Sequence, residues 1–183
     1  MKTRTVKELM VPVSDYATVS RDASLKEAMA ALENKNKQHG EAPYRHRSLV
    51  VVDDKNYVVG RISQIDIMRA LEPKYSEIGD ARWMERAQLS KRMLATIREQ
   101  FQLWDQPVDA MARTMEKTKV ADIMQVPAEG EFVHETDTMN IAMHRIVMGH
   151  HHILLVTRDK VIVGILRSTD VFNALYDMIQ DAE

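Results

Sequence analysis

The chain has 183 residues, no cysteine and a formal net charge of −2. This length suffices for one compact unit with a substantial core or for two small units. Acidic and basic residues are interspersed, so the chain has no net field that would favour nucleic acid or an anionic membrane, and neither partner is expected. Without cysteine, disulfides, thiolate metal sites and cysteine nucleophiles are excluded.

The N-terminal part predicts a short helical turn, a short strand and one full helix. Residues 1–5 lead directly into a charged helical pattern, with no apolar run long enough for a signal peptide or a membrane span, so a cytoplasmic protein is expected. The turn is predicted at residues 5–10 and the strand at residues 16–19. Ser24 begins the helix, because Glu27 three residues later completes a capping box. Apolar residues at helical spacing predict its inward face: Leu25, Ala28, Met29 and Leu32.

A long loop, a hairpin and a second helix follow. The polar run from Glu33 to Arg47 contains Gly40 and Pro43 and predicts a surface loop. Two short β-branched runs joined by a polar turn then predict a hairpin. The strands are predicted near residues 48–52 and 57–62, the turn at 53–56 and the helix at 64–71.

The middle of the chain, residues 73–117, predicts mostly helix. One stripe alternates spacings of four and three residues, which places its members on one helix face: Trp83, Ala87, Ser90, Leu94, Ile97, Phe101 and Trp104. Leu89 and Met93 widen it. The stripe either packs on the protein's own sheets or docks a second copy or a partner, because two Trp residues on one stripe resemble an interface anchor. Pro107 is predicted to end this helix, and a shorter one follows at 108–115.

The last third predicts the same kinds of elements again. A helical turn starts at Val120 and a short strand lies at residues 132–133. A helix at 138–148 is expected to end at Gly149 in the C′ position, which favours glycine. Its inward residues are predicted to be Met139, Ala142, Met143 and Ile146. A second hairpin is predicted from strands 152–157 and 161–166 around a turn at 158–160, before a final helix at 168–179.

A seven-residue segment occurs twice. Gly60-Arg61-Ile62-Ser63-Gln64-Ile65-Asp66 returns as Gly164-Ile165-Leu166-Arg167-Ser168-Thr169-Asp170, offset by 104 residues. Upstream, Leu9-Met10 is matched by Ile123-Met124 and Ala28-Met29 by Ala142-Met143, both offset by 114 residues. The first copy therefore carries ten extra residues between its helix and its hairpin.

The aspartate of each copy is expected in the first turn of a helix. There Ser63 or Ser168 can cap free backbone N–H groups, and a carboxylate suits the helix dipole. A carboxylate at this place can also accept hydrogen bonds from two hydroxyl groups of a ligand. Asp66 and Asp170 are therefore either helix-start residues only or ligand-binding residues.

This layout resembles the CBS domain, named after cystathionine β-synthase, and the chain as a whole is similar to a stand-alone tandem pair, or Bateman module. The resemblance is carried by the matched Leu/Ile-Met and Ala-Met pairs, the apolar hairpin strands and the Gly-x-x-Ser/Thr-x-x-Asp ending, which returns in the second copy with Arg167 at the Ser/Thr place. It implies a mixed α/β (α+β) fold of two β-α-β-β-α repeats, packed sheet to sheet with pseudo-two-fold symmetry. The implied parts are a first repeat at 1–72, a helical insertion at 73–117 and a second repeat at 118–183.

The resemblance also implies a homodimer and a ligand such as AMP, ADP, ATP or S-adenosylmethionine. On this basis Asp66 and Asp170 hold the ribose, and Ser63 helps to hold phosphate. Arg167, which replaces that serine in the second copy, departs from the family pattern but can bind phosphate through its guanidinium fork. The other implied contacts are His46 and Arg47 in the first copy, Thr169, His150 and His151 in the second, and backbone near Ala17 and Glu131 around the base.

His46 and Arg47 lie beside a polar loop, so they either approach the ligand or are simply solvated. Glu129 and Glu131 place acidic groups beside an expected anion, so the first site is expected to bind more strongly than the second.

The favoured function is a non-catalytic regulatory module that needs no cofactor and signals ligand occupancy to a partner protein. Enzyme motifs such as a Walker glycine loop, a nucleophile elbow or His-Glu-x-x-His are missing from the sequence. One alternative is an interaction scaffold with empty clefts that docks through the central helix. The other is a metal site at His150-His151-His152; because at most two of these face one way in a strand, His134, His144 or a carboxylate would have to complete it.

Overall fold

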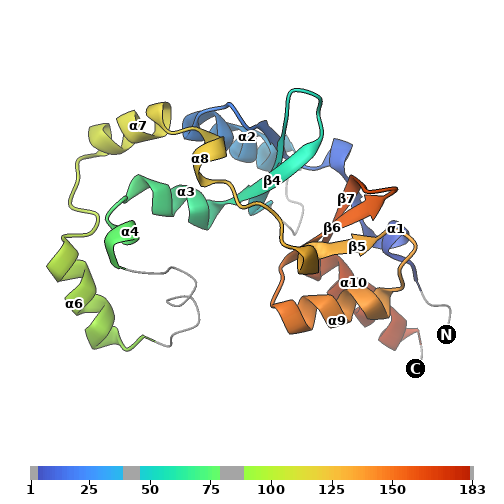
Figure 1. Ribbon diagram of the computed structural model, residues 1–183. Coiled ribbons are helices and arrows are strands. Elements are labelled where there is room, and N and C mark those ends of the chain that lie inside the picture. Colours follow the sequence, from blue (N-terminus) through green and yellow to red (C-terminus); the bar gives the residue numbers. More distant parts are fainter. Residues whose placement is uncertain (1–3, 39–45, 79–88, 182–183) are drawn as a thin grey trace. The chain divides into compact units, whose positions relative to one another are not determined.

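The computed structural model describes residues 4–38, 46–78 and 89–181, which form a mixed α/β fold (Figure 1). The predictions made for Gly40, Pro43, Trp83 and Ala87 lie outside the described residues. The first copy contains α1 (Val6–Leu9), β1 (Val11–Pro12), η1 (Val13–Asp15), β2 (Thr18–Ser20), α2 (Leu25–Gln38), β3 (Ser48–Val52), β4 (Val58–Ser63) and α3 (Gln64–Leu71). The middle contains α4 (Tyr75–Ile78), α6 (Lys91–Phe101) and α7 (Val108–Lys117). The second copy contains α8 (Val120–Ile123), η2 (Glu129–Glu131), β5 (Phe132–His134), α9 (Met139–Gly149), β6 (Ile153–Arg158), β7 (Val161–Arg167) and α10 (Ser168–Gln180).

The described strands form two sheets with matching strand orders. The first is β2-β3-β4 and the second is β1-β7-β6-β5. In each, a short strand runs parallel to the first strand of the hairpin: β2 along β3, and β5 along β6. The predicted hairpin pairing is confirmed for β6 and β7, which run antiparallel with Ile153 opposite Arg167. β1 was not predicted; it adds to the second sheet although it belongs to the first copy.

The segments that open the two copies are exchanged. Val11 of β1 pairs with Ile165 of β7, and the corresponding residue of the second copy, Gln125, pairs with Arg61 of β4. The isolated bridges Thr5↔Thr138 and Ser24↔Lys119 are related in the same way. Each copy therefore supplies backbone hydrogen bonds that complete the other, and this reciprocity matches the expected pseudo-symmetry of the repeats.

α2 starts as predicted and ends later. Glu27 accepts hydrogen bonds from the N–H (2.7 Å) and the hydroxyl (2.8 Å) of Ser24, so the capping box is confirmed. The helix continues to Gln38, and the prediction that the loop begins at Glu33 is wrong. Two lysines in the last turn suit the helix dipole, and the buried side chain of Asn36 is held by hydrogen bonds to residue 46.

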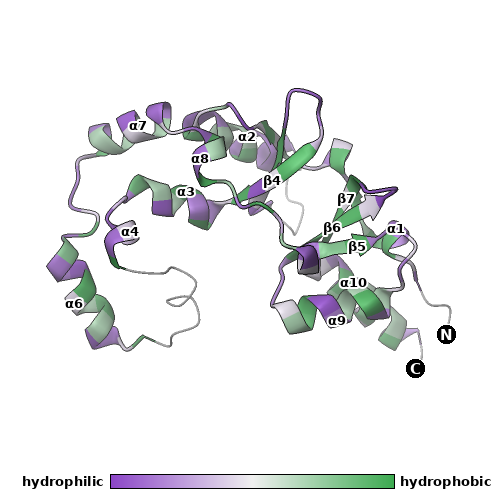
Figure 2. Cartoon of the chain, in the orientation of Figure 1, coloured by the Kyte–Doolittle hydropathy of each residue, from purple (hydrophilic) through white to green (hydrophobic). Residues whose placement is uncertain are grey.

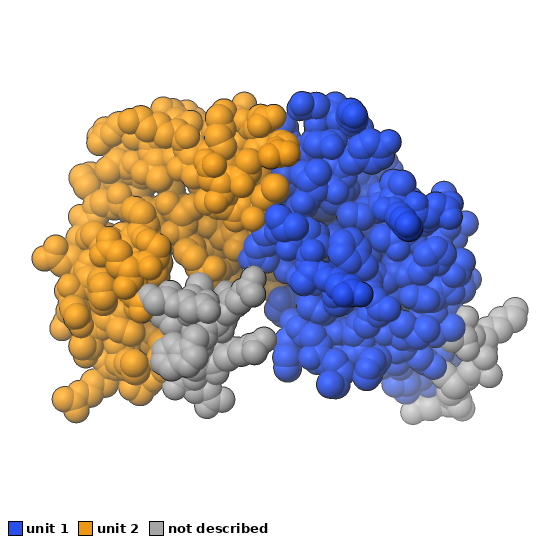
Figure 3. All heavy atoms as spheres, in the orientation of Figure 1, with its two compact units in different colours: residues 1–20, 49–61, 125–183 blue, residues 21–48, 62–124 orange. Residues whose placement is uncertain are grey.

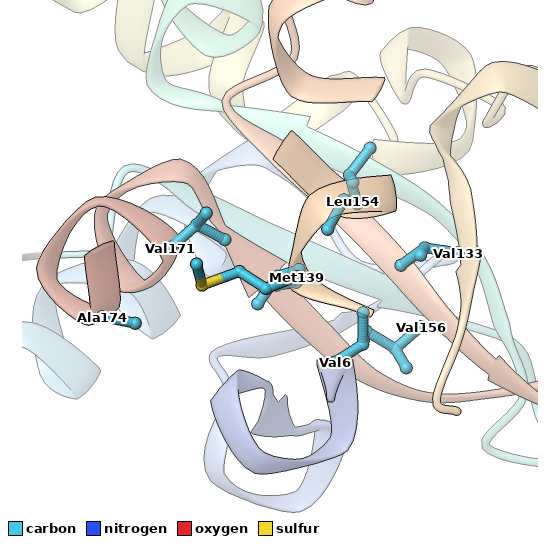
Figure 4. Packing of buried hydrophobic residues seen from close by; sticks show 9 residues of the cluster. Val6, Val133, Met139, Leu154, Val156, Val171 and Ala174 are labelled. Atoms are coloured by element: carbon cyan, nitrogen blue, oxygen red, sulfur yellow. The ribbon is translucent and has the colours of Figure 1, made fainter. Parts of the chain in front are cut away.

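One buried cluster joins α1 to the helices and strands of the second copy. Figure 4 shows Met139 of α9 pointing toward Val171 of α10. Met143 and Ile146 pack against the cluster, so the predicted inward face of this helix is confirmed. Each fully buried Val or Leu here stabilises the fold by about 1.5–3 kcal/mol relative to exposure. The buried members are Val6, Val133, Met139, Ala142, Leu154, Val156, Leu166, Val171 and Ala174.

A second buried cluster contains residues of both sheets. Val50 of β3 packs with Leu155 of β6 and Ile165 of β7, and Tyr16 and Ile153 complete the cluster. Four of the five side chains are aliphatic and Tyr16 is aromatic, so hydrophobic burial and close packing stabilise this cluster. The predicted inward face of α2 is confirmed at its buried residues Leu25, Ala28 and Leu32, but Met29 is exposed and that prediction is wrong.

The helix of the central stripe is shorter than predicted. α6 ends at Phe101, where Gln102 adopts a left-handed conformation (φ 48°), so Trp104 lies beyond the helix and Pro107 does not end it. α6 carries both hydrophilic and hydrophobic residues (Figure 2), and none of them is fully buried. Leu94 is 52% exposed. The interpretation that the stripe packs as a core face therefore does not hold for α6.

The chain that follows α6 is attached to the end of α3. The Trp104 N–H donates to Glu72 Oε2 (2.7 Å), and its indole Nε1–H donates to the Tyr75 hydroxyl (3.1 Å). Glu72 and Leu103 are buried. Trp104, for which the sequence left a core role and an interface role open, thus makes internal hydrogen bonds and remains 40% exposed.

The chain divides into two compact units, coloured in Figure 3. One comprises residues 1–20, 49–61 and 125–183, and the other residues 21–48 and 62–124. Each unit contains residues of both copies, as the exchanged opening segments require. Over the described ranges, no helix has the length and apolar character that crossing a membrane demands.

Candidate functional site

The first strand-to-helix turn is closed by a capping box. Asp66 Oδ2 accepts hydrogen bonds from the N–H (2.8 Å) and the hydroxyl (2.6 Å) of Ser63. In return, the Asp66 N–H donates to Ser63 Oγ (3.2 Å). Asp66 is buried. The predictions that Asp66 lies in the first turn of a helix and that Ser63 caps this helix are confirmed.

The residues before β3 are tied to the same turn. The Arg47 carbonyl accepts a hydrogen bond from the N–H of Gln64 (3.0 Å), the first residue of α3. His46 is held through its backbone, because Asn36 Oδ1 accepts from its N–H (2.7 Å) and Asn36 Nδ2 donates to its carbonyl (3.1 Å). Arg47 is exposed, whereas His46 is buried, so the alternative that His46 is simply solvated is wrong.

Ala17 belongs to the compact unit of residues 1–20, 49–61 and 125–183, whereas Ser63 and Asp66 belong to the other unit. It is buried, and its carbonyl accepts a hydrogen bond from the N–H of Val50 (2.9 Å). It immediately precedes β2, which agrees with the predicted short strand apart from a shift in its ends.

The second turn has the same backbone path and different side-chain chemistry. Here the N-cap residue is Arg167, and Asp170 Oδ2 accepts from its N–H (3.2 Å). The Arg167 guanidinium donates from Nε to Oδ2 (2.7 Å) and from Nη2 to Oδ1 (2.5 Å) of Asp170. Ser168 was predicted as a capping residue and instead is the first residue of α10, with Thr169 exposed after it. The Ser168 N–H donates to the His152 carbonyl (2.9 Å).

The histidine run precedes β6 rather than lying in it. His150 ends α9 in the left-handed conformation (φ 52°), so the predictions of Gly149 at C′ and of alternating strand faces are wrong. A Cβ at position 149 would clash with the ring of His151 in its present orientation, so the glycine allows this close approach. The His151 ring therefore lies directly against the end of α9.

The described residues contain no group of three or more His, Cys, Asp or Glu side chains that could hold a metal ion. His134 Nδ1, one of the expected additional ligands, lies 2.7 Å from Thr136 Oγ1 in a hydrogen bond. His144 is exposed on α9. The metal hypothesis therefore receives no geometric support from the described part of the chain.

An ion pair that was not predicted involves Glu131, a residue that the family resemblance places near the base in the second copy. Arg61 Nε donates to Glu131 Oε2 (3.1 Å), with side chains 22% and 13% exposed. Glu131 ends η2, and a Cβ on its neighbour Gly130 would lie 3.9 Å from His151 Nε2. The acidic group that was expected to repel an anion thus already has a basic partner.

The proposed contacts of the second copy gather at one end of the second sheet. Phe132, which follows η2, pairs with Leu155, and Ile153 pairs with Arg167. Pairing in this register places η2, the start of β6 and the end of β7 at the same end of the sheet. Around it lie one carboxylate on the first turn of a helix, a guanidinium and an imidazole, a set that suits hydroxyl and anionic groups of a ligand.

Sequence reasoning missed two residues that contact predicted site residues: Arg61, which pairs with Glu131, and Asn36, which holds the backbone of His46. Arg61 lies inside the doubled segment, opposite Ile165 in the alignment of the copies. This exchange of an apolar residue for a charged one was the available signal. Asn36 gave no such signal, because its partner lies across the predicted loop.

Comparisons with known proteins identify the family and the fold. The family model of the CBS domain matches residues 6–73 and 120–177. Among solved structures, a CBS domain-containing protein from Bacillus anthracis has a TM-score of 0.63 at 16% identity, covering 95% of this chain and 94% of that chain. CBSX2 in complex with AMP has a TM-score of 0.59 at 19% identity, covering 94% and 97%.

The CBS domain of a bacterial CNNM/CorC family Mg2+ transporter, in complex with ATP, has a TM-score of 0.58 at 14% identity and covers 94% of this chain and 87% of that chain. No curated protein matches the chain. These low identities show a shared fold, and the two family-model segments cover more than half of the sequence. With its doubled turn, matched sheets and exchanged opening segments, the chain belongs to the CBS domain family and carries a pair of CBS domains.

Proposed function

We propose that this chain is a non-catalytic regulatory module that binds an adenosine-type ligand, such as AMP, ADP, ATP or S-adenosylmethionine, and signals its occupancy to a partner. The observation that carries the proposal is the aspartate held on the first turn of a helix in both copies. Two structural neighbours, which share the fold at low identity, are complexes with AMP and with ATP.

The chemistry of the first turn supports ribose binding. Asp66 lies on the first turn of α3, where a carboxylate can accept hydrogen bonds from the two vicinal ribose hydroxyls. The neutral hydroxyl of Ser63 donates to the carboxylate of Asp66, and the Arg47 carbonyl accepts from the N–H of Gln64 at the same turn. The proposed roles are ribose for Asp66, phosphate for Ser63, His46 and Arg47, and base contact for the backbone near Ala17.

Calorimetry with AMP, ADP, ATP and S-adenosylmethionine tests the proposal. Asp66→Asn keeps the size of the side chain and an oxygen that can cap α3, but removes the charged acceptor. Loss of a charge-assisted hydrogen bond costs on the order of 1.5–3 kcal/mol, so the affinity should fall roughly tenfold to over a hundredfold. Asp177→Asn, an exposed carboxylate of α10, is the matched control and should change nothing.

Wild-type protein without affinity for any of these ligands at millimolar concentration would contradict the proposal. Unchanged affinity in Asp66→Asn would refute the role given to that residue. Ligands that bind only the folded protein must raise its melting temperature, so a thermal shift provides an independent measurement.

A scaffold that docks a partner through the central segment is the second candidate. It is favoured by Met93 and Leu94, which are exposed on α6. A chain that shows no ligand-dependent melting shift, yet loses partner binding on Leu94→Glu, would support this function over the first.

We also propose the division into residues 1–72, 73–117 and 118–183, a homodimer and a cytoplasmic location. Light scattering at micromolar concentration tests the dimer, and a monomeric mass would contradict it.

A further inference from the structure

The end of α9 departs from two local preferences of helices. Gly149 is the last helical residue, although glycine destabilises a helix relative to alanine. His150 follows it in the left-handed conformation (φ 52°), which favours glycine. An alanine followed by a glycine would suit this helix end better. Residues that break local preferences are expected where packing or function makes another demand.

The ring of His151 makes that demand. A Cβ at position 149 would clash with three atoms of the ring, Nε2, Cδ2 and Cε1. The same Nε2 would lie 3.9 Å from a Cβ at position 130, which is an ordinary van der Waals distance. Gly130 is the middle residue of η2, and His151 is half-buried. The tip of the imidazole therefore lies close to both the end of α9 and η2.

Two further side chains hold η2 and the start of the next strand. Arg145 of α9 donates a hydrogen bond to the carbonyl of Phe132, the first residue of β5. Arg61 of β4 pairs with Glu131, the last residue of η2. These two contacts act on the C-terminal side of η2, whereas the His151 ring lies beside its middle residue.

We infer that His151 is a positioning residue that spaces η2 from the end of α9, and that Gly149 provides the room for its ring. The inference rests on the proposed function, because it takes the backbone near Glu131 to contact the base of a ligand in the second copy. His151 acts on base binding through η2 and needs no contact of its own with the phosphate.

Nuclear magnetic resonance tests the spacing without ligand. Gly149→Ala should displace the ring, because a side chain rotates more easily than a backbone shifts, and the fold should survive, because alanine is the better helix former. The Cε1–H resonance of His151 and the amide resonances of Gly130 and Glu131 should then change. Val147→Ala, at a 68% exposed position of the same helix end, also raises helix propensity. It is the matched control and should leave these resonances unchanged.

Calorimetry with AMP tests the effect on binding, in an Asp66→Asn background that weakens the first site. Gly149→Ala should lower the AMP affinity roughly two- to tenfold, the value of one neutral hydrogen bond between η2 and the base. His151→Ala should lower it to a similar extent, and Val147→Ala should not change it. When His151→Ala is already present, Gly149→Ala should have no further effect, because the added methyl group has no ring to displace.

Ribose 5-phosphate separates base binding from a direct phosphate contact. It carries the sugar and phosphate of AMP without the base. Gly149→Ala and His151→Ala should therefore leave its affinity for the Asp66→Asn protein unchanged in a titration followed by nuclear magnetic resonance. An equal loss for AMP and ribose 5-phosphate would make His151 a phosphate contact and overturn the inference.

Other outcomes would also overturn it. Unchanged resonances of Gly130 and Glu131 in Gly149→Ala would refute the spacing of η2, and so would a loss of AMP affinity that Gly149→Ala still causes without the ring. Loss of all AMP binding in Asp66→Asn, while the wild type binds AMP, would refute the role at the second site and leave the proposed function standing. Wild-type protein that binds no nucleotide would refute the proposed function, and the ligand-free spectra alone would then decide the spacing of η2.

Discussion

The two strand-to-helix turns place the same carboxylate beside different partners. In the first copy Ser63, a neutral residue, binds Asp66, and in the second Arg167, a cation, binds Asp170. The first pair carries one net negative charge and the second carries none. The two turns thus share a capping-box backbone and differ in the residue three positions before the aspartate, which is serine in one and arginine in the other.

The residues near the expected base position differ in the same sense. Glu131 of the second copy corresponds to Ala17 of the first, and Arg61 of the first copy corresponds to Ile165 of the second. Glu131 and Arg61 form an ion pair, whereas Ala17 and Ile165 are both buried and apolar. One pair of positions is therefore charged and the other is neutral. The proposed sites of the two copies thus differ in charge.

Replacing Ile165 should give the largest change in stability. Ile165 is fully buried in the cluster that includes Val50 and Leu155. Ile165→Ala should lower the free energy of unfolding by about 2–5 kcal/mol, because it removes buried methyl groups and leaves a cavity. Urea denaturation measures this value. Ile165→Val is the graded control and should cost about 0.5–1.5 kcal/mol, and equal costs for both would contradict a packing role.

The corresponding position of the first copy, Arg61, should be less sensitive. Arg61→Met removes the partner of Glu131 while retaining much of the side-chain volume. Because both side chains are partly exposed, we expect a loss of about 1–2 kcal/mol, below the 3–5 kcal/mol typical of a fully buried pair.

A double-mutant cycle identifies the cause of this loss. Adding Glu131→Gln to Arg61→Met should cost less than the sum of the two single changes. Strict additivity in the unfolding free energies would show that the two residues act independently, and the comparison between the copies would then concern packing alone.

The sequence predicted those parts of the fold that local signals determine. The helix at Gln64–Leu71 and the strand at Ser48–Val52 were predicted with correct ends, because a capping box and a β-branched run are read over a few residues. β1 was missed: it has two residues, one of them proline, and its pairing with β7 joins distant parts of the chain. A strand of this kind exists only through its partner.

In the candidate site, too, only the locally determined features were predictable from the sequence. The placement of Asp66 and Ser63 followed from local spacing, and so did the first-turn position of Asp170. The bidentate Arg167–Asp170 geometry and the burial of His46 did not, because rotamers and long-range hydrogen bonds decide them. The roles of these residues toward a ligand stay predictions.

The two helix caps offer the next comparison. Ser63→Ala removes the hydroxyl that caps α3, and the free energy of unfolding should fall by about 1 kcal/mol. Ser168→Ala at the second turn should change it by less than about 0.5 kcal/mol, because Arg167 occupies the N-cap position there. Equal effects of the two substitutions in urea denaturation would contradict the difference between the turns.

The smallest expected effect concerns pH and the far end of the second hairpin. Arg158 donates hydrogen bonds to both oxygens of Glu135 (2.5 and 2.7 Å), and these bonds are the main cause that lowers the pKa of Glu135 below its usual 4.5. A carboxyl whose pKa is lowered by folding stabilises the folded state above its unfolded pKa. This contribution is lost as the pH falls through the lowered value.

Glu135→Gln cannot undergo this titration, so its unfolding free energy should differ from that of the wild type by a constant amount near neutral pH. The difference should shrink as the pH falls below 4.5. The positions that correspond to Glu135 and Arg158 in the first copy are Arg21 and Asp54, both exposed and with the charges reversed. Asp54→Asn is therefore the matched control, and it should show no comparable pH dependence. A gap between wild type and Glu135→Gln that widens toward acid would mean that the ion pair does not stabilise the folded state.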